Sequence, residues 1–164
     1  MKKLILGLLV IGLTSQINAQ IIELDEVKIT AVNYKYLSAV DSKDVAIPVK
    51  LLEEKVALFD LKNAEFYLDE YDLYQVKFFI PDGTILAVYD GDGKIIRTVE
   101  RFKNVKLPNN VRMAVTEKYP NWSFKKDVYR VTYNDGKSTK EYKIVLTNGD
   151  KTIRVKLNDE GDFL

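Results

Sequence analysis

The spacing of apolar residues along the chain follows a helical period in two separate segments. The first stripe predicts a helix from Pro48 to about Asp60, because its members recur every three or four residues and proline fits the first turn of a helix. The second stripe predicts a helix from Pro108 to about Tyr119. The stripes consist of Val49, Leu52, Val56 and Phe59, and of Val111, Ala114, Val115 and Tyr119. We expect both stripes to be buried, including Phe59 and Tyr119 in the last turns.

After each of these helices the period changes to two, which is typical of strands with one buried face. Turn residues separate the alternating segments, which cover about residues 74–80, 85–89, 95–102, 123–133, 140–147 and 151–157. We expect two further contributions to the sheet. Val27–Tyr36 is β-rich, and Tyr67–Tyr74 interleaves acidic and aromatic residues in the way a strand hairpin would. An alternative for Tyr67–Tyr74 is a docking surface, since tyrosine offers a large contact area.

Similar residues recur at equivalent points of the two halves. Val45–Pro48 matches Val105–Pro108 at an offset of 60 residues, and Thr84-Ile85 matches Thr152-Ile153 at an offset of 68. The coincident proline, threonine and glycine positions favour a tandem repeat over chance alternation. We therefore predict an α+β domain at 45–164, made of two repeats of a helix and an antiparallel meander, 45–103 and 104–164. The two helices would pack on one face of a sheet of about eight strands, and residues 20–44 would form an N-terminal strand and a connector.

The turn and strand motifs resemble those of a known family. The Tyr74-x-Val76 strand, the Asp82-Gly83 turn, the Asp90–Ile96 hairpin and their second-unit counterparts look like the PepSY-like proteins that share the fold of the β-lactamase-inhibitor protein. The resemblance covers about Val45–Leu164, and the chain looks like the exported versions common in Bacteroidota. It implies a protein-, peptide- or ligand-binding role. It transfers no site residues, because the shared motifs are turn and strand signals.

The first 19 residues have the pattern of a cleavable signal peptide. The positive pair Lys2 and Lys3 precedes the apolar run Leu4–Leu13, and polar and small residues lead to Ala19, so we expect cleavage before Gln20. The alternative, a membrane anchor, would need an apolar run about twice as long. Of the 25 Lys and Arg, cleavage removes two and leaves 23 against 24 acidic residues. We expect a periplasmic or secreted protein that does not insert into the membrane. We also expect that it does not bind nucleic acid, because proteins that do so normally carry an excess of basic residues.

The sequence offers little catalytic chemistry. It contains no His and no Cys, which excludes Ser-His-Asp and Cys-His catalysis and zinc sites built on those ligands. The turn Asp90–Gly93 lacks the first and last ligands of a calcium loop, and a hairpin that requires glycine explains it. A pair of carboxylates is the remaining catalytic possibility. We expect a protein that is not an enzyme and that holds no metal or cofactor.

The outward side of the expected sheet differs between the two units. In the first unit it is apolar at Phe79, Leu86 and Val88. The corresponding residues of the second unit are polar or basic, and they are Thr147, Arg154 and Lys156. An exposed apolar patch marks an interaction site when nothing intramolecular covers it. The cover would be a binding partner, with Lys77 and Tyr71 at the polar edges of the patch, the strand expected at Val27–Tyr36, or curvature of the sheet itself.

These patterns favour an exported, non-enzymatic binding module that acts through the side of the sheet opposite its helices. The partner would be an unidentified protein, peptide or small ligand of the cell envelope, bound in an inhibitor-like manner. An alternative function is that of a propeptide-like or structural envelope protein that masks a partner.

Overall fold

Three helices and six strands occupy residues 33–42 and 44–164, the part of the chain that the computed structural model describes. The helices are α2 (Tyr34–Val40), α3 (Ile47–Ala57) and α4 (Asn109–Lys118). The strands are β1 (Leu73–Ile80), β2 (Gly83–Asp90), β3 (Ile95–Lys103), β4 (Ser123–Asn134), β5 (Lys137–Asn148) and β6 (Lys151–Asn158). The predicted signal peptide, residues 1–19, lies outside the described residues.

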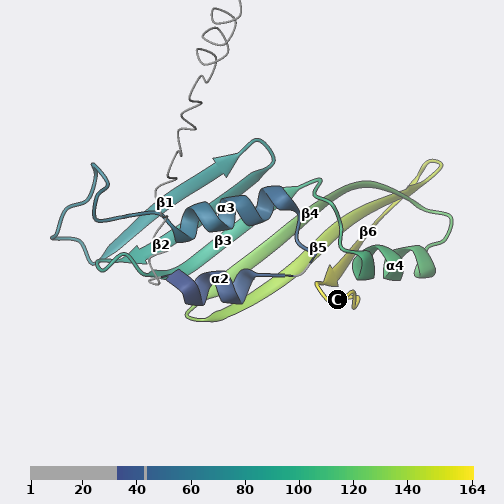
Figure 1. The fold of residues 1–164 in the computed structure, drawn as a ribbon. Helices are drawn as coiled ribbons and strands as arrows, with labels where there is room; N and C mark the ends of the chain where they lie inside the picture. Colours follow the sequence, from purple (N-terminus) through teal and green to yellow (C-terminus); the bar gives the residue numbers. More distant parts are fainter. Residues whose placement is uncertain (1–32, 43) are drawn as a thin grey trace, which may run out of the picture.

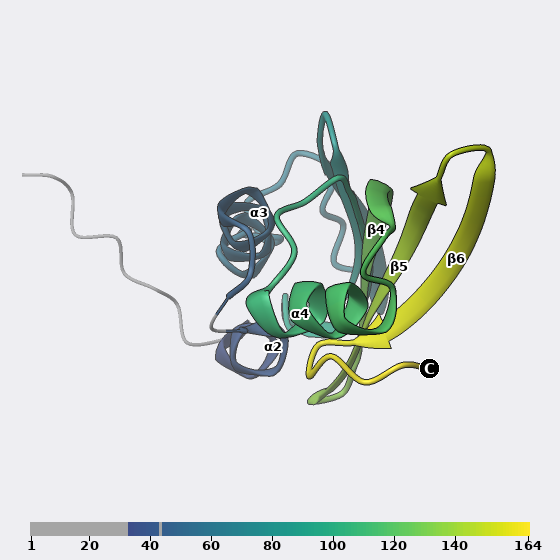
Figure 2. The same cartoon turned by 90° about the vertical axis from the view of Figure 1, so that its right-hand side faces the viewer.

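The six strands form a single antiparallel sheet in which each strand pairs with the next along the chain (Figure 1). Seen from the side, α2, α3 and α4 all lie on the same face of this sheet (Figure 2). We refer to the opposite face, which carries no helix of the described chain, as the helix-free face. The two-layer arrangement follows from the alternation in each strand, because only one set of side chains can reach the helices.

Helices α3 and α4 lie within the two segments whose apolar stripes have a helical period. In α3, Pro48 occupies the first turn, and Val49, Leu52 and Val56 are buried. In α4, Val111 and Val115 are the buried residues. An apolar stripe along one side of a helix turns that side toward the core and leaves the other side in water. These two helices therefore form where local pattern and burial agree.

The predicted fold, a tandem repeat with two helices on a sheet of about eight strands, is wrong. The described residues contain a third helix, α2, and one six-stranded sheet. Residues 34–36, expected in a strand, belong to α2, because Tyr36 and Val40 lie four residues apart and are both buried on the same side of a helix. Residues 27–32 of that expected strand lie outside the described residues. The expected hairpin before β1 is also wrong, since residues 64–72 form turns and bends and Leu73 begins the first strand of the described residues.

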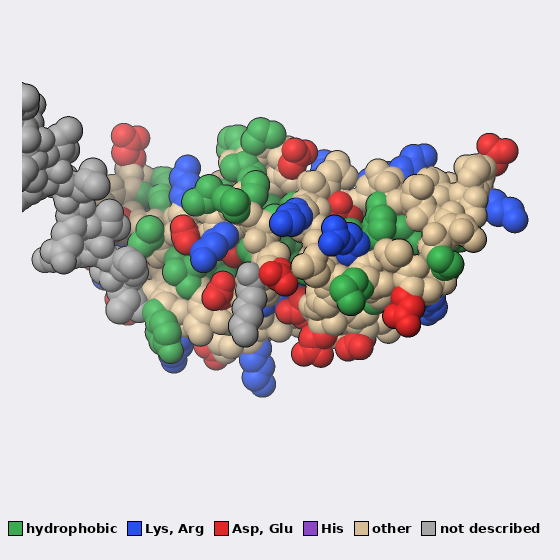
Figure 3. Space-filling view, turned by 45° about the vertical axis from the view of Figure 1, so that its right-hand side comes forward, with side chains coloured by type: hydrophobic (Ala, Val, Ile, Leu, Met, Phe, Trp, Pro, Cys, Tyr) green, Lys and Arg blue, Asp and Glu red, His purple; other side chains and the backbone are tan. Residues whose placement is uncertain are grey.

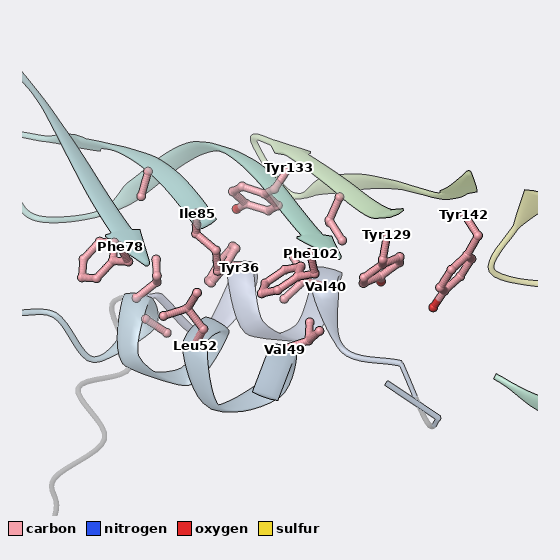
Figure 4. Packing of buried hydrophobic residues seen from close by; sticks show 14 of the residues in the cluster. Tyr36, Val40, Val49, Leu52, Phe78, Ile85, Phe102, Tyr129, Tyr133 and Tyr142 are labelled. Carbon is pink, nitrogen blue, oxygen red and sulfur yellow. The ribbon is translucent and has the colours of Figure 1, made fainter. Parts of the chain in front are cut away.

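Aromatic side chains fill much of the space between the sheet and the helices (Figure 4). Tyr129 and Tyr142, neighbours on β4 and β5, stack with ring centroids 4.5 Å apart. Tyr36 of α2 meets Tyr133 of β4 edge to face at 5.3 Å. Such pairs each contribute about 0.5–1.5 kcal/mol beyond the burial of their area. The core therefore runs continuously from the helices across the central strands.

Phe59 and Tyr119, expected to be buried at equivalent places, are both half-buried. Each follows the end of its helix instead of lying in the last turn. Phe59 packs edge to face on Phe78 at 5.2 Å, and Tyr119 packs against Phe163 near the end of the chain at 6.1 Å. These rings close the margins of the core and leave its centre to other residues.

Gly83 is required by a close approach and not by its backbone conformation. It begins β2 directly opposite Phe102 of β3, and its φ is not positive. A Cβ atom at this position would lie 2.4 Å from a ring atom of Phe102. Glycine therefore makes room for an aromatic side chain that is itself fully buried.

Candidate binding face

The antiparallel register arranges the side chains of the helix-free face in rows across the sheet. Lys77, Leu86 and Val99 lie side by side on β1, β2 and β3. Phe79 belongs to a neighbouring row and is opposite Thr84. Their strand neighbours Phe78, Ile85 and Ala87 are buried on the helix side. Alternation along each strand therefore directs these rows away from the core.

An apolar patch covers the part of this face formed by β1–β3. Phe79 is 74% exposed and Val99 is 46% exposed, whereas Leu86 and Val88 are half-buried by their neighbours. Leu73, at the start of β1, is 59% exposed on the same side. We refer to these five residues as the apolar patch. Large exposed apolar side chains grouped on one surface are typical of interaction sites.

The structure brings four of the five proposed site residues together and leaves out the fifth. Phe79, Leu86, Val88 and Lys77 share the helix-free face, with Lys77 directly opposite Leu86. Tyr71 precedes β1 and packs edge to face on Tyr74, at 6.2 Å, and the Tyr74 side chain is buried on the helix side. Tyr71 is therefore not part of the rows that form the apolar patch.

The expected cover of the patch by Val27–Tyr36 is wrong for the portion that the structure describes. Tyr34–Tyr36 form the beginning of α2, on the face that carries the helices. Residues 27–32 lie outside the described residues. The described chain therefore leaves the apolar patch open to a partner.

The remaining part of the helix-free face is basic. Its Lys and Arg residues on β3 are Arg97, Arg101 and Lys103, and those on β4–β6 are Lys126, Arg130, Lys137, Lys143, Arg154 and Lys156. The acidic side chains that the described strands place on this face are Asp90, which accepts hydrogen bonds from the turn after β2, and Glu141. On the helix-bearing side, by contrast, basic and acidic side chains are intermixed (Figure 3). A chain of nearly balanced charge thus concentrates its positive charge on one surface.

A groove of about 440 Å³ lies within this basic region. Six cationic residues line it, and they are Arg101, Lys103, Lys126, Arg130, Lys143 and Arg154. Val128 and Val145 add apolar surface between them. Asp127 also lines the groove, and its carboxylate accepts a hydrogen bond from the Val105 N–H at 3.2 Å. We refer to this site as the basic groove.

Sequence reasoning found only part of the basic groove. The alternation in the last two strands indicated that Arg154 and Lys156 point outward. It did not include Arg101 and Arg130, because their contribution depends on the pairing of β3 with β4. That pairing joins segments on either side of α4, and no local pattern specifies its register. The alternating Arg97, Val99 and Arg101 of β3 were the available signal.

Two carboxyl groups lie inside the core beneath α2. Glu53 of α3 is 2% exposed and Glu100 of β3 is 1% exposed. Tyr36 donates a hydrogen bond to Oε1 of Glu100 at 2.9 Å, and Thr98 donates to the same oxygen at 2.7 Å. Burial raises the pKa of both carboxyls, and the charge of Glu100 raises the pKa of Glu53 further. Glu53 is therefore the member of the pair that holds a proton near neutral pH.

This buried pair is the carboxylate arrangement that the sequence left open as a catalytic possibility. Within the part of the chain that the structure describes, Oε1 of Glu53 and Oε2 of Glu100 have no hydrogen-bond partner. Both groups are nevertheless almost fully buried, and only Glu53 borders a groove, of about 440 Å³, between α2 and α3. Their geometry makes them a source of pH-dependent stability. The described residues contain no cluster of three or more acidic side chains that could hold a metal ion.

No family model, no curated protein and no solved structure matches the chain. The resemblance to PepSY-like proteins thus stays a prediction that rests on the turn and strand motifs. Among the described helices, none is sufficiently long and apolar to cross a bilayer.

Proposed function

We propose that this chain is an exported, non-enzymatic binding module that holds a protein or peptide partner on the helix-free face of its sheet. The observation that carries this proposal is the open apolar patch. Phe79 and Leu73 are more than half exposed on a sheet surface that no described helix covers. Burying such side chains against a partner contributes about 25 cal/mol of favourable binding free energy for each Å² of apolar area removed from water.

The arrangement of the face supports binding over structural packing. Apolar residues on the helix side are enclosed by α2, α3 and α4, whereas Phe79 and Leu73 on the helix-free face stay more than half exposed after folding. A partner that covers the patch supplies the missing burial. The nearby basic residues add charges at the border of the patch, and charges at such a border select a partner and accelerate its association.

Two exposure-matched leucines test the proposal. Leu73 on the helix-free face is 59% exposed, and Leu51 on α3 is 60% exposed. We expect Leu73→Ser to weaken capture of the partner from the cell envelope by about tenfold, since truncating one well-packed interface residue costs about 1–2 kcal/mol. Leu51→Ser removes a similar apolar area from the other face and should leave capture unchanged.

Leu86→Ser provides a second test at the centre of the patch. We expect it to weaken capture while the thermal midpoint changes little, because Leu86 is covered only partly by its own chain. Unfolding of this variant would show that Leu86 belongs to the core. Equal loss of capture by Leu73→Ser and Leu51→Ser, or no loss by either, would contradict the proposal.

A further inference from the structure

Like charges lie directly opposite each other at two places on the helix-free face. Arg101 of β3 is paired with Arg130 of β4, and Lys143 of β5 is paired with Lys156 of β6. Like charges at directly opposite positions of antiparallel strands destabilise a sheet. The folding of the sheet therefore does not explain this arrangement. An anionic ligand that lies over the two strands and contacts both cations would explain it.

Two carboxylates of the described residues lie among these cations, Glu141 and Asp127. Glu141 is 3.9 Å from Arg130 and 3.0 Å from Lys143, measured between nitrogen and oxygen atoms. The two carboxylates offset two charges, whereas six cationic residues line the basic groove. The Arg130 side chain remains 45% exposed and the Lys143 side chain 32% exposed. Both can therefore still meet a ligand from solvent.

The rows of the sheet set the distance between the anionic groups of such a ligand. Arg101 and Arg130 lie in one row, and the next row along the same strands holds Lys103 and Lys143 on either side of Val128. Two residues along a strand correspond to roughly 6.8 Å. An extended peptide repeats its side chains on one face at the same spacing, so acidic residues at alternate positions fit the successive cationic rows.

We propose that the basic groove binds an extended acidic segment of a protein partner, whose alternate Asp or Glu residues pair with the row of Arg101 and Arg130 and with the next row, which holds Lys103 and Lys143. This proposal rests on the proposed function and names the chemistry of the partner. The planar guanidinium groups of Arg101 and Arg130 match the geometry of carboxylates and bind them with two parallel hydrogen bonds. Val128 and Val145 supply apolar contact for the stem of an acidic side chain.

The lining of the groove favours a peptide over other polyanions. None of the described residues that line it is aromatic, whereas proteins that bind single-stranded nucleic acid stack bases on aromatic rings. The cations also surround a hollow, which fits an extended chain better than the flat surface of an anionic membrane.

Fluorescence anisotropy with a labelled synthetic peptide of four Glu-Ser repeats tests the proposal on the exported protein. We expect the peptide to bind, and its affinity to fall by about threefold or more between about 50 and about 200 mM NaCl, because exposed charges are screened by salt. A peptide of four Gln-Ser repeats, which has the same length without the charges, should not bind.

The variant Arg101→Gln/Arg130→Gln should weaken peptide binding by about tenfold, since two exposed ion pairs together contribute about 1–2 kcal/mol. The control Lys50→Gln/Lys55→Gln removes the same charge from exposed positions on α3 and should bind as the original protein does. The arginine variant should also be at least as stable to denaturant, because it relieves a repulsion between strands.

Three results would overturn the proposal. They are failure of the Glu-Ser peptide to bind at low salt, equal weakening by the two double variants, and tighter binding of an oligothymidylate or of phosphatidylglycerol vesicles through the same arginines. Partner capture that depends on Leu73 but not on Arg101 and Arg130 would overturn this inference and leave the proposed function standing. Peptide binding that depends on the arginines, together with partner capture that Leu73→Ser does not affect, would overturn the proposed function and leave this inference standing.

Discussion

The buried pair Glu53 and Glu100 predicts that the protein loses stability as the pH rises. Both carboxyls have a raised pKa in the folded protein, caused first by burial and, for Glu53, next by the charge of Glu100. The folded state therefore holds a proton that the unfolded chain releases above its ordinary glutamate pKa of about 4.3. Their stabilising contribution is present below that pH and is lost as the pH rises through the folded-state pKa.

The magnitude follows from the number of protons that the folded pair retains. One retained proton lowers the free energy of unfolding by about 1.4 kcal/mol for each pH unit. Between about pH 5 and about pH 7 the loss amounts to roughly 2–3 kcal/mol, a large fraction of the stability of a typical domain. Lys140 acts in the opposite direction, because its charge lowers the pKa of both carboxyls. Lys140 therefore narrows the pH range over which the folded pair retains its proton.

Urea titrations at several pH values measure this slope, and the substitution Glu53→Gln isolates its cause. Glutamine is a neutral stand-in for the protonated acid, so we expect the variant to have a flatter dependence on pH than the original protein. Glu117→Gln, at an exposed position on α4, removes one carboxyl without changing the core and should keep the original slope. Stability that stays level or rises between about pH 5 and about pH 7 would refute the reasoning, as would equal slopes for the original protein and Glu53→Gln.

Three other expectations concern single sites. Gly83→Ala should lower the free energy of unfolding by about 1–3 kcal/mol in denaturant titration, because the added Cβ has no room beside the ring of Phe102. Gly91→Ala should be nearly neutral, because its Cβ would meet nothing closer than 3.6 Å. Similar losses for the two variants would contradict this explanation. Phe59→Ala should cost about 2–3 kcal/mol and Phe66→Ala, at a ring 53% exposed, clearly less. The reverse order would place Phe59 on the surface. Intact-mass measurement should show an exported protein that begins at Gln20, and retention of the first 19 residues would disprove the predicted cleavage.

The parts of the fold that sequence could predict are those fixed by local periodicity. The stripes of α3 and α4 specify helices because each buries one side, and the alternation from β1 to β6 specifies strands with one face in the core. Residues 34–36 were mistaken for a strand because aromatic residues favour strands in general, and residues 37–40 were mistaken for a connector. The true period of this segment is visible in only one pair of buried residues, Tyr36 and Val40, four positions apart.

The turn segment before β1 shows the limit of alternation as a signal. Acidic and aromatic residues alternate in residues 65–72, yet Phe66, Leu68 and Tyr71 all remain more than half exposed. No strand pairs with this segment, so the alternation has no buried face to specify. Three members of the apolar patch, Phe79, Leu86 and Val88, could be predicted because they depend on alternation within β1 and β2. The basic groove could not, because it depends on the register between β3 and β4.

Site-specific photo-crosslinking in the living cell tests the central claim, partner binding on the helix-free face, most directly. A photoreactive phenylalanine analogue at Phe79 would be compared with the same analogue at Ile47, since both side chains are 74% exposed and Ile47 lies on α3. The account predicts a discrete crosslinked partner from Phe79 and none from Ile47. A partner crosslinked from Ile47 and not from Phe79 would contradict it.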